Sequence, residues 1–122
     1  MTDAIATAAA ALFEAECSGR QIGLLSRAHP EWGLDEAYAV QGALVAAKVA
    51  AGARPVGWKI GLTSRAMQQA LGIDTPDSGV ILDDMLFDSG ATVSKGRFIQ
   101  PRIEAEIDRQ WRDVGRSRLS VR

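Results

Sequence analysis

The sequence predicts an α+β domain in which helices come first and strands follow. Apolar residues recur at helical spacing up to residue 51, and the period changes to two at Pro55. Short strand-like runs separated by turn residues then occupy the chain after residue 79. Helices and strands segregated along the chain are typical of α+β proteins, whereas doubly wound sheets alternate the two. The 122 residues contain no internal repeat or low-complexity linker, so we expect one domain.

Residues 3–18 are predicted to form the first helix. Ile5, Ala9 and Leu12 follow helical spacing, and Gly19 suits the position just past a helix end. The next segment, residues 21–33, is expected to be a connector because His29 precedes a proline and is disfavoured in helix.

Residues 34–51 are predicted to form the second helix, with two acids in its first turn and Gly52 at its end. A stripe of apolar side chains along it is expected to face the core: Leu34, Tyr38, Leu44, Val45 and Val49.

The second half of the chain is predicted to contain the strands. Residues 56–61 alternate as a strand, and residues 65–71 form a short helix that Thr63 or Ser64 caps. The remaining expectations are a loop at 73–79, a strand that bends within 80–87, a short strand at 91–94 and a strand at 98–107.

Composition argues against several classes of function. The net charge is -1, so nothing indicates binding to nucleic acid or to an anionic membrane. No stretch of about 20 apolar residues could span a bilayer, and the first residues do not form a signal peptide. The single cysteine, Cys17, suits a reducing compartment, so we expect a cytoplasmic protein.

Two acids in the motif IEAEI, Glu104 and Glu106, are candidate metal ligands. On a strand they project from the same face, roughly 6.5–7 Å apart at Cβ. At that separation two carboxylates can coordinate one magnesium, manganese or calcium ion between them. The alternative is a solvated strand face on which Arg102 neutralises one acid.

Lys59 and Asp77 are candidate catalytic residues. Gly57 and Gly61 flank Lys59 on its own strand face, so a ligand could approach it closely. Loss of water in such a notch would lower the pKa of the lysine toward the range useful for proton transfer. Asp77 lies in a predicted loop and could act as an acid, and the alternatives are a solvated lysine and a simple turn aspartate.

Four motifs together resemble the hydratase/decarboxylase branch of the fumarylacetoacetate hydrolase superfamily. They occur in the family's order, within residues 3–107: EAYAVQ (36–41), GWKIGLTS (57–64), PDSGVILDDMLF (76–87) and RFIQPRIEAEI (97–107). The resemblance implies helices followed by the first strands of that family's mixed β fold, in incomplete form.

The resemblance also implies a chemistry. Family members are magnesium- or manganese-dependent lyases of aromatic-compound catabolism, in which Glu104 and Glu106 would bind the metal and Lys59 and Asp77 would be catalytic. The implied reaction adds water to a 2-hydroxy-2,4-dienoate or 2-oxo-alkenoate, such as 2-oxo-hept-3-ene-1,7-dioate. The implied alternatives are an oxalocrotonate decarboxylase-type enzyme and a non-catalytic fragment that pairs with a full-length relative.

The sequence departs from the family pattern after Ile107. Residues 108–122 hold five arginines, and only Asp108 and Asp113 follow Glu106 as acids, so a third metal ligand is missing. We therefore expect a truncated hydratase-like part at 1–107, inactive alone, and an atypical Arg/Ser-rich tail at 108–122, which we interpret as out-of-frame or aberrant. We expect small-molecule substrates, and either a homo-oligomer or association with a related decarboxylase or hydratase.

Overall fold

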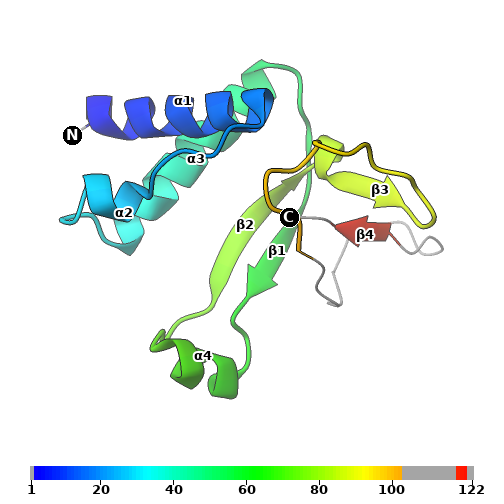
Figure 1. The fold of residues 1–122 in the computed structure, drawn as a ribbon. Coiled ribbons are helices and arrows are strands. Elements are labelled where there is room, and N and C mark those ends of the chain that lie inside the picture. Colours follow the sequence, from blue (N-terminus) through cyan, green and yellow to red (C-terminus); the bar gives the residue numbers. More distant parts are fainter. Residues whose placement is uncertain (1, 103–117, 121–122) are drawn as a thin grey trace.

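The computed structural model describes residues 2–102 and 118–120 and has helices followed by strands, so the predicted α+β class is confirmed (Figure 1). Its elements are α1 (Thr2–Ser18), α2 (Leu25–Ala28), α3 (Leu34–Ala50), β1 (Pro55–Gly61), α4 (Arg65–Leu71), β2 (Asp77–Leu82), the 3₁₀ turn η1 (Asp83–Met85), β3 (Leu86–Asp88) and β4 (Arg118–Ser120). No helix within this part of the chain is long and apolar enough to cross a membrane.

Helices α1 and α3 pack against each other and form the apolar core of the helical part. Ala8 and Ala9 of α1 meet Val40 of α3, and all three are buried. Small alanine side chains let the two helix backbones approach closely, and larger apolar residues of both helices surround this contact. The predicted stripe on α3 is wrong at its ends, because Leu34 is 57% and Val49 41% exposed.

The helix ends follow the local sequence. The Glu36 carboxylate accepts a hydrogen bond from the Gly33 backbone N–H at 2.8 Å, which satisfies a donor at the start of α3. Ser64, one of the two predicted caps, accepts from the Met67 N–H at 3.1 Å and begins α4. Gly72 ends α4 in a left-handed conformation (φ 66°), which a residue without Cβ adopts readily.

Strands β1 and β2 form an antiparallel hairpin that extends away from the helices, with α4 at its far end (Figure 1). The hairpin register pairs Trp58 with Val80 and Ile60 with Ser78, and a bulge lies between Pro55 and Gly57. A second small sheet pairs β3 with β4.

Four expectations for connecting segments were wrong. The connector contains the short helix α2, and β2 begins at Asp77, inside the predicted loop. Residues 91–94 and 98–102 are not strands. A strand requires a ladder partner, and none lies beside these residues in the described part of the chain; Pro101 also lacks an N–H donor. Residues 103–107 of the predicted last strand lie outside the described residues.

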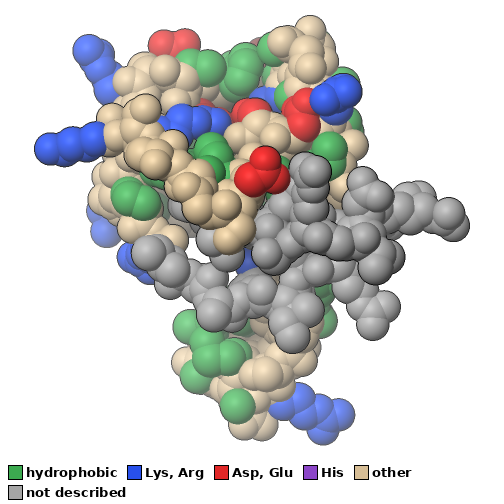
Figure 2. Space-filling model, turned by 90° about the vertical axis from the view of Figure 1, so that its right-hand side faces the viewer, with side chains coloured by type: hydrophobic (Ala, Val, Ile, Leu, Met, Phe, Trp, Pro, Cys, Tyr) green, Lys and Arg blue, Asp and Glu red, His purple; other side chains and the backbone are tan. Residues whose placement is uncertain are grey.

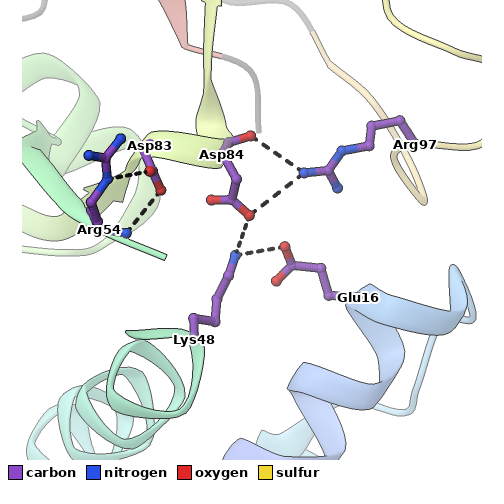
Figure 3. Close-up of polar contacts among 6 residues, drawn as sticks. All are labelled: Glu16, Lys48, Arg54, Asp83, Asp84 and Arg97. Carbon is purple, nitrogen blue, oxygen red and sulfur yellow. Dashed lines mark hydrogen bonds and ion pairs between the residues drawn. The ribbon is translucent and has the colours of Figure 1, made fainter. Parts of the chain in front are cut away.

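A polar cluster around Lys48 joins the helices to the corner after β2 (Figure 3). Lys48, only 5% exposed, lies on α3 and contacts Glu16 Oε1 of α1 at 2.7 Å and Asp84 Oδ2 of η1 at 3.5 Å. Arg97 donates to the Asp84 carbonyl at 3.5 Å. The buried Lys48 ammonium thus connects α3 with α1 and with η1, which are distant in the sequence.

Arg54 and Asp83 join the start of β1 to the same corner. The Asp83 carboxylate accepts from the Arg54 backbone N–H at 2.9 Å and from Arg54 Nε at 3.0 Å, and the Asp83 N–H donates back to the Arg54 carbonyl. The backbone hydrogen bond and the guanidinium together hold the pKa of Asp83 below its usual value.

The Arg54–Asp83 contact predicts a pH dependence of stability. Because the pKa of Asp83 is lowered in the folded state, its contribution is fully present above the unfolded pKa, about 4, and is lost as pH falls through the folded value. Asp83→Asn is therefore expected to lower the free energy of unfolding at pH 7 and to have a smaller effect near pH 2. Urea titrations followed by circular dichroism measure this difference. Asp74→Asn, in the exposed loop before β2, is the control, and an equal loss at both pH values would contradict the assignment.

Candidate active site

The two faces of the β1–β2 hairpin differ in chemistry. Lys59 lies opposite Gly79, and Gly61 lies opposite Asp77. Directly paired residues of antiparallel strands project to the same side, so the ladder places Lys59 and Asp77 on one face as diagonal neighbours. Each of the two charged side chains therefore has a glycine as its direct cross-strand partner. The structure brings these two predicted catalytic residues together.

Asp77 lies over Gly61. A Cβ placed on Gly61 would overlap Asp77 Oδ1 and would lie 3.2 Å from Asp77 Cγ. The absence of a side chain at Gly61 is thus what allows the Asp77 carboxylate to lie across the neighbouring strand. From the sequence, Gly61 was expected only as a neighbour of Lys59. The pairing of Gly61 with Asp77 follows from the strand register.

Lys59 is half-buried on a face that its glycines leave open. Among the described residues, a Cβ on Gly57 would meet no atom within 4 Å, and a Cβ on Gly79 would meet Gln41 Nε2 at 3.9 Å. No atom of the described residues therefore fills the place of a side chain at Gly57, and strand glycines of this kind often mark the close approach of a ligand or another backbone.

Helix α3 holds the outer edge of β2 beside this face. The Tyr38 hydroxyl accepts a hydrogen bond from the Ser78 N–H at 3.1 Å, and Gln41 Nε2 donates to the Ser78 carbonyl at 3.1 Å. Both backbone groups of the residue after Asp77 are therefore satisfied by one helix. From the sequence, Tyr38 was expected in the core and Gln41 was given no role. Their spacing of three residues, which places both on one side of a helix, could have indicated that they act together.

The chain leaves β1 through a turn that needs an unusual backbone. Leu62 has a positive φ of 53°, which is rare for a residue with a branched side chain. Gln68 Nε2 donates to the Leu62 carbonyl at 2.6 Å, so α4 holds this turn in place. Such local strain is retained where the surroundings determine the conformation, often beside functional sites.

The predicted metal ligands Glu104 and Glu106 lie outside the described residues. Among the residues that the structure does describe, no three His, Cys, Asp or Glu side chains gather as metal ligands would. Asp77 is the carboxylate that this part of the chain places on the Lys59 face. The described residues alone therefore do not form a metal centre, and the two glutamates remain a prediction.

Two hollows at the junction of the helices and strands lie away from the Lys59 face. One of about 430 Å³ is lined by Lys48, Asp83 and Asp84, among others. Lys48 already contacts two carboxylates there, so its charge is compensated within the protein. We attribute this hollow to the junction of helices and strands and assign it no ligand.

Comparison with known proteins places the chain beside hydratases. It is 43% identical over 100 residues to the 2-keto-4-pentenoate hydratase of Paraburkholderia xenovorans (strain LB400), covering 82% of this chain and 37% of the relative. It is 47% identical over 96 residues to the 2-oxo-hept-4-ene-1,7-dioate hydratase of Escherichia coli, covering 79% of this chain and 36% of the relative. The 2-keto-4-pentenoate hydratase 1 of Dechloromonas aromatica (strain RCB) is 47% identical over 100 residues, covering 82% of this chain and 38% of the relative.

A solved structure shares the fold over much of the chain. The 4-oxalocrotonate decarboxylase of Pseudomonas putida G7, complexed with calcium and acetate, superposes with a TM-score of 0.66 at 32% identity, covering 70% of this chain and 33% of that one. The same enzyme complexed with magnesium and adipate is equally similar. No family model matches the sequence. The resemblance expected from the four motifs is confirmed, and the chain spans less than two fifths of the length of these relatives.

Proposed function

We propose, because this chain is homologous to part of the 2-keto-4-pentenoate hydratases, that it carries the proton-transfer residues of a hydratase centre. The observation that carries the proposal is the Lys59–Asp77 face, where two groups capable of proton transfer lie diagonally across a glycine-bordered ladder. The substrate class is a 2-hydroxy-2,4-dienoate or the related 2-oxo-alkenoate. The relatives named as hydratases support this class.

The proposed chemistry requires protons to be moved at a conjugated substrate. Lys59 would act as the acid/base that lets the dienol become a 2-oxo-alkenoate, to whose conjugated double bond water then adds. Asp77, which lies over Gly61 on the same face, would orient a water molecule beside the substrate. The open space at Gly57 and Gly79 would admit the flat substrate.

We propose that the site also binds a divalent metal ion. Glu104 and Glu106 would supply two carboxylate ligands, and oxygen ligands of this kind suit magnesium or manganese. When bound, the ion would polarise the carbonyl group of the substrate and stabilise negative charge that develops on it. The calcium and magnesium complexes of the decarboxylase support a divalent ion, and magnesium specifically is our proposal.

A chimera tests the function directly. Residues 3–107 would replace the corresponding segment of the Dechloromonas aromatica hydratase, which is 47% identical over 100 residues. With magnesium, the chimera is expected to consume 2-hydroxypenta-2,4-dienoate, measured as loss of dienol absorbance. Glu104→Gln and Glu106→Gln are each expected to weaken magnesium binding in calorimetry by at least tenfold. A folded chimera that binds magnesium but does not hydrate the dienoate would refute the proposed function.

The decarboxylase provides a second candidate reaction. Its structure matches at a TM-score of 0.66, and the described site residues do not distinguish loss of carbon dioxide from addition of water. The same chimera, offered 4-oxalocrotonate, would release carbon dioxide if the chain carried the residues that select decarboxylation. We favour hydration because the curated relatives at 43–47% identity are hydratases.

Gly61→Ala is expected to separate activity from stability. The new methyl group would displace the Asp77 carboxylate, the end of an exposed side chain that can move at little cost to the fold. We expect hydration by the chimera to fall by up to about a hundredfold, because a group misplaced by about 1 Å can cost about 10²-fold in rate. Gly42→Ala, on α3 and away from the Lys59 face, is the control, because a Cβ there meets no atom of the described residues within 4 Å. Equal activities of the two variants would contradict the placement of Asp77 at the site.

A further inference from the structure

The face of the hairpin opposite Lys59 is apolar and exposed. Trp58 and Ile60 alternate with Lys59 along β1 and are 57% and 61% exposed. Val80 pairs with Trp58 and so adds to the same face. Exposure of tryptophan and isoleucine side chains to water is unfavourable, and burial of this apolar surface under another surface would stabilise the strand.

The outer edge of β1 is also open within the part of the chain that the structure describes. β1 pairs with β2 alone in a two-stranded sheet, while the outer edge of β2 is occupied at Ser78 by Tyr38 and Gln41. Two-stranded sheets are marginally stable by themselves, and an open edge is a ready partner for a further strand.

A second set of exposed apolar side chains continues at the end of the hairpin. Met67 and Leu71 of α4 are 52% and 56% exposed, and Ile73, just after the helix, is 42% exposed. Figure 2 shows hydrophobic side chains on α4 at the lower end of the molecule. The apolar character therefore extends beyond a single pair of residues.

The relatives extend well beyond the part that they share with this chain. The hydratases share 43–47% identity with this chain over about 100 residues, yet those residues are only 36–38% of their length. The decarboxylase likewise has about two thirds of its structure beyond the shared part. A homologous hairpin in those proteins therefore folds in the presence of a much larger body of chain.

We propose that Trp58, Ile60, Val80 and the free edge of β1 are the docking surface for the remainder of a 2-keto-4-pentenoate-hydratase fold. The occupant is a polypeptide homologous to the part of the hydratase that has no counterpart in residues 3–107. It would place an apolar sheet surface on Trp58 and add a strand beside β1. This inference rests on the homology and on the exposed face, and not on catalytic activity.

Co-expression of the 122-residue chain with that remainder of the Dechloromonas aromatica hydratase tests the proposal. We expect a soluble one-to-one complex by size-exclusion chromatography with light scattering, and slower amide exchange in residues 55–61 than in the chain alone. The double variant Trp58→Ser, Ile60→Ser is expected to reduce recovery of the complex at least tenfold. Leu34→Ser is the matched control, because Leu34 is equally exposed but lies on α3.

The outcomes separate this surface from the proposed function. A complex that protects β1 but hydrates no dienoate supports the docking surface and refutes the hydratase assignment. Recovery of the complex that is unaffected by the double variant would overturn the docking surface. A chain that forms only homodimers through β1, with the remainder staying insoluble, would overturn it as well. Circular dichroism of the free double variant tests whether its fold is retained. Amide exchange of residues 55–61 in the chimera measures the same contact independently.

Discussion

Replacement of Lys59 by methionine is expected to lower hydration by the chimera about a thousandfold and to leave its fold unchanged. General acid–base groups typically contribute about 10²–10⁴ to a rate, and methionine keeps the length of the lysine side chain without an ionisable group. Lys59 is half-buried on a face bordered by Gly57, Gly61 and Gly79, so removal of its charge leaves no packing defect in the core.

The Lys59 measurement has a control and a second readout. Lys95→Met removes an exposed lysine from the segment after β3 and should leave the rate within about twofold. Lys59→Arg keeps the charge but has a pKa too high for proton transfer near neutrality, so it should be almost as inactive as methionine. An active Lys59→Arg variant would show that the lysine acts through charge alone, and a Lys59→Met variant within threefold of wild type would contradict the assignment.

Replacement of Lys48 by methionine is expected to lower the free energy of unfolding of the 122-residue chain by about 2 kcal/mol. Removing one partner of a fully buried ion pair costs about 3–5 kcal/mol. Here the lysine is 5% exposed but the Glu16 and Asp84 side chains are 38% and 41% exposed, so solvent stabilises the carboxylates left behind and the effect is smaller.

Urea unfolding followed by circular dichroism measures the Lys48 effect. Arg20→Met, at an exposed position just after α1, should change the free energy of unfolding by less than about 0.5 kcal/mol. If Lys48→Met behaves like this control, the cluster of Figure 3 does not join the helices to the strands energetically. A double-mutant cycle with Glu16→Gln isolates the 2.7 Å contact, because Asp84 is unchanged in all four proteins.

Several features of the fold were predictable because they depend on neighbours in the sequence. Glycines after α1, α3 and α4 mark helix ends, and the period of two in β1 separates Trp58 and Ile60 from Lys59. The bend after Leu82 was also expected, since Asp83 and Asp84 interrupt an apolar run. Strands at 91–94 and 98–102 were mispredicted because strand propensity without a partner does not form a ladder.

The candidate site was predictable only in part. Lys59 and Asp77 were chosen separately, one from its glycine neighbours and one from a motif, and nothing local indicated that they share a face. Tyr38 and Gln41 were missed as residues that hold Ser78, because their partners lie about 40 residues further along the chain. Glu104 and Glu106 stay predictions.

The sequence by itself determined where helices end, which side chains of β1 share a face, and that the chain is related to hydratases through its motifs. The tertiary structure alone decided that Asp77 lies over Gly61 on the Lys59 face, and that Lys48 is buried beside two carboxylates. The physical reason is that periodicity and capping act between neighbours in the chain. Strand register and ion-pair burial depend instead on how segments distant in the sequence pack together. The same local pattern is compatible with several such arrangements.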